Sequence, residues 1–165
     1  MEKFGSFYQD YKKMLFAYLM RMTGDYYLAS DIMQENFTRY LERYTGQIPN
    51  AALLFTIARN ALWDHSRVRG RNARLKDDPI DGAGSQEYGL MVKQEYRQVI
   101  AAMQRLKDNE RDILALAISD GLSYRDIASI VGISVENVKV KVHRTRLKLK
   151  KILNRGETNH ELFDQ

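Results

Sequence analysis

LSYRDIASIVGISVENVKVKVHRTRLKLKK, residues 122–151, is the stretch that decides the fold of this chain. Ser123 and Asp126 have the spacing of a capping box at the start of a short helix. Gly132 predicts the end of that helix, because glycine readily adopts the left-handed conformation that closes a helix. Ser134 is positioned to cap a second helix two residues later. Two helices joined by so tight a turn form a helix-turn-helix, a motif whose second helix enters the DNA major groove.

The second helix has one apolar side and one cationic side. At about 100° per residue, one narrow stripe holds the residues that we expect to face the rest of the domain: Val138, Val142, Thr145, Leu149 and Ile152. From residue 137 to residue 155 the chain holds eight Lys and Arg and no Asp or Glu. A solvated helix mixes charge signs to form ion pairs, whereas displacing counterions from DNA needs cations alone. The charge asymmetry therefore favours a DNA-binding helix.

Composition narrows the class of protein. The 165 residues carry a net charge of +5 and an apolar fraction of 44%, which suits a globular protein with an anionic partner. The absence of cysteine excludes disulfides, thiolate chemistry and cysteine-based zinc sites. The longest nearly apolar run, residues 51–58, is too short to span a membrane, and the N-terminus lacks a signal-peptide core. We therefore expect a cytoplasmic protein without membrane insertion.

Helical apolar spacing runs through nearly the whole chain, so we predict an all-α fold. We expect two small helical bundles, one at residues 4–69 and one at residues 88–154, the second containing the helix-turn-helix. Residues 70–87 contain glycine, proline and acidic residues, a composition that predicts a flexible linker. The acids of this linker could alternatively occupy a basic channel as a nucleic-acid mimic. Residues 155–165 are expected to form a polar, frayed tail.

Local signals predict several helix boundaries. We expect helices at 27–43 and 51–69, with Asn50 as the cap of the second. In the second bundle Asp108 is expected to cap a helix that buries Ile118. Leu41 is expected to face inward from the helix at 27–43.

Four motifs follow one another along the chain: DIMQE at 31–35, LFTIARN at 54–60, GLSYRDIA at 121–128 and VKVKVHRTR at 138–146. They resemble, in the same order, the D-x-x-Q-E, L-Y-x-I-A-R-N, G-x-S-Y-x-E-I-A and V-K-S-R-L-H-R-A-R signatures of bacterial extracytoplasmic-function sigma factors of the sigma-70 family. The resemblance covers residues 7–153. It implies a region 2-like domain at 4–69, a region 4-like domain at 88–154, and an alternative sigma factor that binds core RNA polymerase and directs promoter recognition.

The resemblance also implies three groups of site residues. The residues that match those docking on the polymerase clamp helices share one helical face: Asp31, Gln34 and Glu35. The residues expected at the −10 element lie on a loop that could capture a flipped base and on the helix after it: Tyr44, Gln47, Asn50, Arg59, Asn60, Trp63 and Arg67. Trp63 could stack on a base, although a lone tryptophan more often packs in the core or against a helix. The residues expected at the −35 element lie on the second helix of the helix-turn-helix: Glu136, Asn137, Lys139, Val140, His143 and Arg144.

Two other classes of protein stay open at this point. A stand-alone helix-turn-helix regulator would share the second bundle but would not need the 31–35 face. An enzyme would need a catalytic constellation, yet the three histidines lie far apart and no phosphate-binding loop or nucleophile motif is present. We therefore expect no enzymatic activity, no cofactor, no metal site and no small-molecule substrate.

The resemblance further implies regulation by an anti-sigma factor. Two units on a tether could be clamped together by such a partner. The sequence leaves open whether the free protein is closed or extended.

Overall fold

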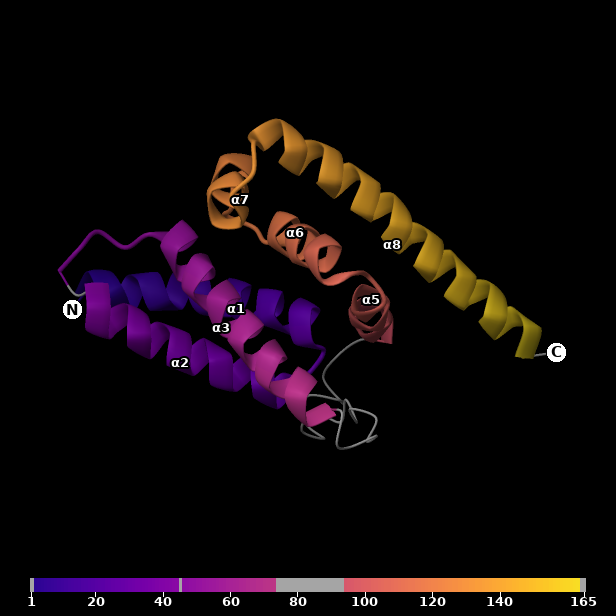
Figure 1. Cartoon of the computed structure of the whole chain (residues 1–165), viewed down its shortest axis with the longest axis horizontal. Coiled ribbons are helices and arrows are strands. Elements are labelled where there is room, and N and C mark those ends of the chain that lie inside the picture. Colours follow the sequence, from indigo (N-terminus) through magenta and orange to yellow (C-terminus); the bar gives the residue numbers. More distant parts are fainter. Residues whose placement is uncertain (1, 45, 74–93, 164–165) are drawn as a thin grey trace.

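The computed structural model describes residues 2–44, 46–73 and 94–163, and within them the predicted all-α fold is confirmed. Seven helices make up the regular structure of these residues (Figure 1). Their bounds are α1 Glu2–Thr23, α2 Tyr26–Tyr44, α3 Ala51–Ala73, α5 Gln94–Gln104, α6 Asp108–Ile118, α7 Tyr124–Val131 and α8 Val135–Phe163. The predicted linker at 70–87 lies outside the described residues from residue 74 onward. In the described part of the chain, no helix combines the length and apolar character needed to cross a membrane.

The first three helices bury a common core. α1 and α3 both pack on α2, and the side chains of Leu15, Ile32 and Phe55 from the three helices are fully buried. Aromatic rings fill one end of this bundle, where the ring centroids of Phe7 and Tyr40 lie 5.3 Å apart. Burying each such side chain contributes about 1.5–3 kcal/mol, so apolar packing rather than helix propensity holds the unit together.

α7 and α8 form the predicted helix-turn-helix, with the turn at residues 132–134. The hydroxyl of Ser123 accepts a bond from the N–H of Asp126 at 3.1 Å, and the Asp126 carboxylate accepts one from the N–H of Ser123 at 2.9 Å. Gly132 closes α7 in the left-handed conformation, at φ 79° and ψ 34°. The hydroxyl of Ser134 then accepts from the N–H of Asn137 at 3.2 Å, at the start of α8. The angle at which α8 leaves the turn is therefore fixed by local bonds.

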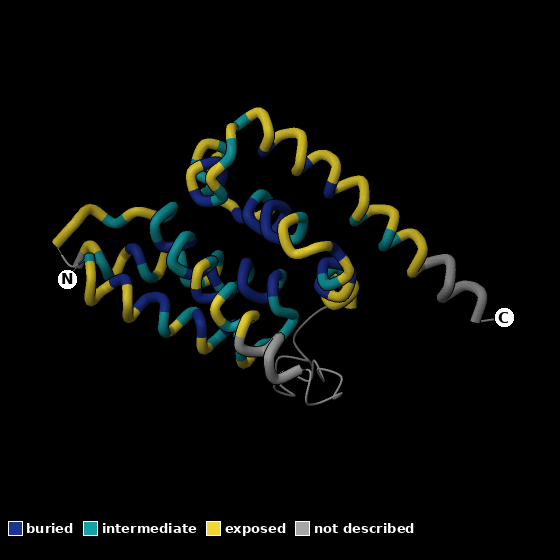
Figure 2. Tube along the Cα trace, viewed as in Figure 1, coloured by how far each residue is buried: buried dark blue, intermediate teal, exposed yellow. Residues whose placement is uncertain are grey.

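α8 has the two different sides that its periodicity predicts. Val138, Val142 and Thr145 are buried, in the part of α8 that packs on α6 and α7, and Leu149 and Ile152 are half-buried further along. The opposite side is exposed along most of the described length (Figure 2). α8 is thus a covering helix and not a core helix.

Several boundaries differ from the sequence-based expectation. The N-cap of α6 is Lys107, without a side-chain bond, and Asp108 is instead the first helical residue. Its carboxylate still favours the helix start, because an acid in the first turn opposes the positive end of the helix dipole. Leu41 and Ile118 were expected to be buried but are each 37% exposed, since both lie close to the end of their helix.

The helix ends also reach further than expected. α3 continues to Ala73, beyond the expected boundary at residue 69, and α8 continues to Phe163, where a frayed tail was expected. Neither extension contains a proline. A single glycine such as Gly156 costs a helix only about 1 kcal/mol, which is too little to end it.

The two helical units lie against each other. α1 packs on α5 and α6, and α3 packs on α7, while α8 lies on the far side of α6 from the first unit (Figure 1). A single cluster of buried apolar side chains includes Leu19 and Phe55 of the first unit and Met103 and Leu114 of the second. The structure therefore has the units closed on each other.

Candidate functional site

The acidic side of α2 is accessible in the closed arrangement. Asp31 and Gln34 are exposed, and the Glu35 side chain is 41% exposed on the same side of the helix. Glu35 binds Arg39 at 2.5 Å and lies 3.8 Å from Nε2 of His65 on α3. The structure thus places the three predicted residues on one surface, with Arg39 and His65 as neighbours of Glu35. Only Arg39 could have been found from the sequence, through its i, i+4 spacing from Glu35.

The α2–α3 loop is bonded to the helices on both sides of it. Asn50 caps α3 as predicted, because its Oδ1 accepts from the N–H of Leu53 at 3.2 Å. Its own N–H donates to the hydroxyl of Tyr40 at 2.8 Å. Tyr44 is half-buried, with its ring centroid 5.4 Å from that of Tyr40. Tyr44 and Asn50 thus hold the loop in place. The side chain of Gln47 is exposed and takes no part in these contacts.

Beside Gln47 the loop presents a residue that sequence reasoning missed. Ile48 is 87% exposed, the most exposed of the large apolar side chains in the described residues. The sequence signal was an isoleucine inside an otherwise polar turn, directly before Pro49. A lone exposed apolar residue is common on protein surfaces, so its position next to Gln47 is what makes it a candidate contact.

Arg59 has surroundings that the sequence did not predict. Its Nε donates to Oδ2 of Asp112 on α6 at 2.6 Å, and its guanidinium lies 5.4 Å from the centre of the Trp63 ring. The Arg59 side chain is 23% exposed and that of Asp112 is 2% exposed. The hydroxyl of Tyr18 on α1 donates to the other carboxylate oxygen at 2.6 Å.

The electrostatics of this cluster follow from its burial. Burial, the nearby Asp112 charge and the hydrogen bond to Asp112 together raise the pKa of Tyr18 well above its ordinary value. Tyr18 therefore stays protonated and remains a donor. A buried carboxylate is stable only when it is paired and hydrogen-bonded, and Asp112 has both kinds of partner.

Asp112 and Tyr18 were not among the predicted site residues. The available signal was a carboxylate inside an apolar run, since residues 112–118 read DILALAI. Residues 112–116 of α6 are all buried, so the carboxylate lies inside the protein. Periodicity alone could not identify its partners, because both come from the other helical unit.

The remaining predicted residues of α3 have mixed environments. Asn60 and Arg67 are exposed. Trp63 is half-buried and lines a cavity of about 200 Å³ together with Gln104 and Arg111 of the second unit. The structure thus brings Arg59 and Trp63 together between the units, and leaves Asn60 and Arg67 at the surface.

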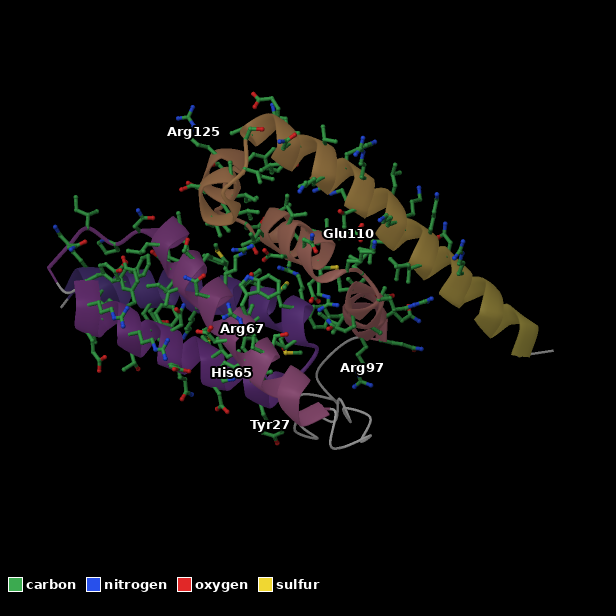
Figure 3. All side chains as sticks on the ribbon, in the orientation of Figure 1. Tyr27, His65, Arg67, Arg97, Glu110 and Arg125 are labelled. Atoms are coloured by element: carbon green, nitrogen blue, oxygen red, sulfur yellow. The ribbon has the colours of Figure 1, made fainter. Side chains whose placement is uncertain are left out.

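The predicted reading side of α8 is open to solvent. All six of its residues are exposed: Glu136, Asn137, Lys139, Val140, His143 and Arg144. Val140 is 45% exposed, on the side opposite the buried stripe, as its helical angle predicts. Arg125 of α7 also projects into solvent (Figure 3). Sequence reasoning missed Arg125, although the first helix of such a motif crosses the DNA backbone.

Two further residues of α8 have distinct surroundings. Lys148 binds Glu110 of α6 at 2.5 Å, so part of the cationic side is paired within the second unit. Leu147 is 50% exposed. In the described part of the chain, no group of His, Asp and Glu side chains could hold a metal ion.

Comparison with known proteins assigns both units to one family. Residues 7–72 match the family model described as Sigma-70 region 2, and residues 96–149 match the one described as Sigma-70, region 4. The chain is similar to the ECF RNA polymerase sigma factor SigM of Bacillus subtilis (strain 168), with 33% identity over 153 residues, 90% of this chain and 94% of that protein. It is also similar to the ECF RNA polymerase sigma factor EcfG of Rhodopseudomonas palustris (strain TIE-1), with 31% identity over 140 residues, 83% of this chain and 77% of that protein.

Solved structures share the fold. One is the sigma factor RpoE in complex with the anti-sigma factor NepR from Bartonella quintana, with a TM-score of 0.75, 23% identity and coverage of 93% of this chain and 98% of that one. Another is CnrH in complex with the cytosolic domain of CnrY, with a TM-score of 0.66, 22% identity and coverage of 92% and 88%. The agreement extends over both units, so it includes the overall arrangement of the helices.

Proposed function

This chain belongs to the extracytoplasmic-function class of the sigma-70 family, and we propose that it works through three separate surfaces. As a member of that family it is an alternative sigma factor, which binds core RNA polymerase and directs it to promoters for transcription initiation. The observation that carries this function is that both region models match one chain, each on its own helical unit. Sigma factors are initiation factors, so we assign the catalysis of RNA synthesis to the polymerase.

The first surface is the acidic side of α2, and it docks on the polymerase. Asp31 and Glu35 supply negative charge and Gln34 supplies an amide, on a side of the helix that is exposed although the units are closed. Carboxylates there suit a basic partner surface and steer its approach. The ion pair between Glu35 and Arg39 is exposed on both sides, so it is weak and can be exchanged for a partner's cation.

The second surface holds the separated −10 strand. Gln47 and Ile48 at the loop offer hydrogen bonds and apolar contact to an extruded base, and Tyr44 and Asn50 hold the loop in place. Along α3, Asn60 and Arg67 are exposed and can contact the phosphates of a single strand. The remaining members of this surface are Arg59 and Trp63, which pack between the units in the closed arrangement.

The third surface is the exposed side of α8, which reads the −35 duplex. Val140 can meet a thymine methyl group, and Arg144 or Lys139 can contact guanine edges or phosphates. Glu136 and Asn137 lie in the first turn, where a recognition helix approaches the bases most closely. The remaining member is His143, and Arg125 of α7 is an additional phosphate contact.

Regulation and location follow from the family. We propose an anti-sigma factor as the regulatory partner, because one structural neighbour is a sigma factor in complex with an anti-sigma factor and another, CnrH, is bound to the cytosolic domain of CnrY. Polymerase and promoter DNA are the partners of a sigma factor, so we assign the protein to the cytoplasm. A stand-alone regulator would not need a region 2 unit, and residues 7–72 match that region.

In vitro transcription with core polymerase on a promoter library tests this function. A defined class of start sites should appear only when the protein is added. Combined Asp31→Lys and Glu35→Lys substitutions should abolish binding to core polymerase while the helical circular dichroism signal is unchanged. A matched control reverses two other exposed acids, Asp10→Lys with Glu95→Lys, and should bind normally. Normal binding by the first variant would disprove the docking surface.

A further inference from the structure

Asp112 is a charged residue of the second unit whose bonds are made to the first unit. One carboxylate oxygen accepts from Tyr18 of α1 and the other from Arg59 of α3, both at 2.6 Å. The Asp112 residue is 1% exposed, and Tyr18 is fully buried. Asp112 keeps these two bonds only while the units are closed, so closure rests on specific polar bonds as well as on apolar packing.

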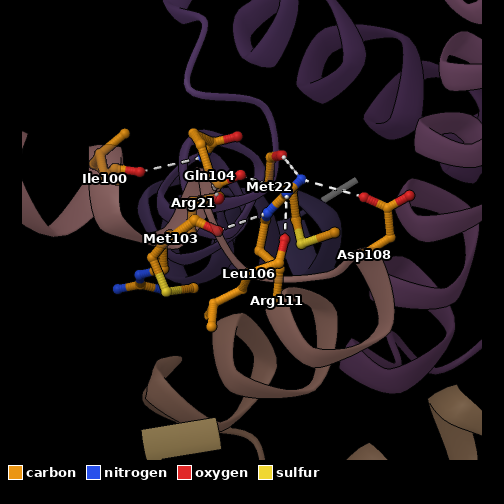
Figure 4. Close-up of polar contacts among 8 residues, drawn as sticks. All are labelled: Arg21, Met22, Ile100, Met103, Gln104, Leu106, Asp108 and Arg111. Atoms are coloured by element: carbon orange, nitrogen blue, oxygen red, sulfur yellow. Dashed lines mark hydrogen bonds and ion pairs between the residues drawn. The ribbon is translucent and has the colours of Figure 1, made fainter. Parts of the chain in front are cut away.

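A second set of polar bonds joins the units about one turn further along α1, at its C-terminal end. Arg111, the neighbour of Asp112, donates to the carbonyls of Met103, Gln104 and Leu106 at the end of α5 and to the carbonyl of Met22 on α1 (Figure 4). The amide of Gln104 also donates to the carbonyl of Arg21 at 2.8 Å (Figure 4). The bonds to Met103, Gln104 and Leu106 stay within the second unit and satisfy carbonyls at and just after the end of α5. The bonds to Met22 and Arg21 cross to the first unit, so they join the units without involving the proposed DNA-binding residues.

Arg59 is the residue at which closure and DNA binding conflict. Its Nε donates to Asp112, its guanidinium lies against the Trp63 ring, and 23% of its side chain is exposed. A DNA phosphate offers the same kind of anionic oxygen as the carboxylate. Both acceptors therefore compete for one guanidinium.

We infer that Asp112 is an internal competitor of promoter DNA, which holds Arg59 and keeps the two units closed until the DNA strand or the polymerase replaces it. This inference rests on the proposed assignment of Arg59 to the −10 surface. In the closed protein the −10 surface is incomplete, because Arg59 is bonded to Asp112 of the second unit and Trp63 is half-buried beside it. Opening exposes Arg59 and leaves Asp112 accessible to water, where an ionised carboxylate is stable.

The arrangement can be measured in the full-length protein. Because the chain contains no cysteine, Glu42→Cys on α2 and Lys150→Cys on α8 give two labelling sites for energy transfer between the units. Asp112→Asn removes the charge while retaining an acceptor for Tyr18. We expect lower energy transfer in this variant and about tenfold tighter binding, in fluorescence anisotropy, of a single-stranded DNA pool of random sequence. The gain in affinity equals the increase in the open fraction of the protein, because only in the open form can Arg59 contact the DNA.

Two controls separate this effect from simple charge. Glu110→Gln removes the same charge from α6, but Glu110 pairs with Lys148 inside the second unit, so energy transfer should be unchanged. Adding Arg59→Gln to Asp112→Asn should remove the gain in single-strand binding while the units stay open. Tyr18→Phe serves as a second opening variant should Asp112→Asn prove unfolded by circular dichroism, and it should lower energy transfer in the same direction.

The outcomes are distinct. Unchanged energy transfer in a folded Asp112→Asn variant, or a gain in DNA binding no larger than that of Glu110→Gln, overturns the inference. A gain that survives Arg59→Gln also overturns it, since another residue would then be responsible. Neither readout contains polymerase, so a protein that fails to bind polymerase would disprove the proposed function without changing these results.

Discussion

The substitution Gly132→Ala tests how the helix-turn-helix is built. Gly132 has φ 79°, in the left-handed region, and a Cβ added there would meet no heavy atom within 4 Å outside its chain neighbours. The cost is therefore conformational and not steric. A left-handed conformation costs an alanine about 1–2 kcal/mol. The stiffer unfolded chain returns about 0.4–1 kcal/mol, so the net loss of unfolding free energy should be about 1 kcal/mol.

Thermal unfolding followed by circular dichroism measures this loss. For a chain of this size, 1 kcal/mol corresponds to a decrease in Tm of about 2–4 °C. Gly132→Asn should lose less than Gly132→Ala, because asparagine tolerates the left-handed conformation better. Gly156→Ala is the matched control, since Gly156 lies inside α8 with equally open surroundings. There alanine is the better helix former, and Tm should not fall.

The refuting result is equally definite. Should Gly132→Ala leave Tm unchanged, or should Gly156→Ala lower it as much, the left-handed turn would not be the cause. Promoter selection by Gly132→Ala at a permissive temperature should stay normal, because the bond of Ser134 at the start of α8 is retained. A changed promoter preference would mean that the left-handed turn at Gly132 contributes to the angle of α8 beyond the Ser134 cap.

Three further predictions concern single side chains. Tyr18 has a raised pKa in the folded protein, so as pH rises above its ordinary value of 10.0 the unfolded chain loses its proton first. The contribution of Tyr18 to the free energy of unfolding is therefore complete below this pH and decreases as pH rises toward the raised pKa of the folded protein. In urea unfolding, Tyr18→Phe should lose less stability with rising alkaline pH than the unsubstituted protein. Ser123→Ala removes the acceptor of the capping box and should cost about 1 kcal/mol in urea unfolding, with no loss if the box is unimportant. Arg144→Ala should weaken selection of the −35 element without changing Tm, since Arg144 is exposed, and a binding slope against salt that falls by about 1 would identify a phosphate contact.

The elements that could be predicted from the sequence are those determined by local bonds or by one helical face. The capping box at Ser123, the left-handed Gly132 and the buried stripe of α8 all follow from spacing within about one or two turns. The exposed acids of α2 and the exposed reading side of α8 follow from the same periodicity. These features depend on residues close to one another in the chain, so an isolated sequence contains the information.

The features that could not be predicted depend on contact between the units. Asp112 gave a signal as a carboxylate in an apolar run, yet Tyr18 and Arg59 lie 94 and 53 residues away in the chain. Periodicity cannot choose partners over such separations. For the same reason Arg59 was predicted as a DNA contact without the carboxylate that holds it. The error at Asp108 is of another kind, because a shift of one residue decides whether an acid caps a helix or occupies its first turn.

The unequal accessibility of the two proposed DNA-binding surfaces has a consequence in time. The outer side of α8 is exposed in the closed protein, whereas Arg59 is paired with Asp112 of α6 and only partly exposed. On the proposed assignments, the upstream duplex can therefore be engaged first. Gln47, Asn60 and Arg67 are already exposed, whereas Arg59 becomes available to a melted strand only after the two units separate. Closure would in this way delay the contact of Arg59 with the separated strand, and DNA of the wrong sequence could dissociate during that delay.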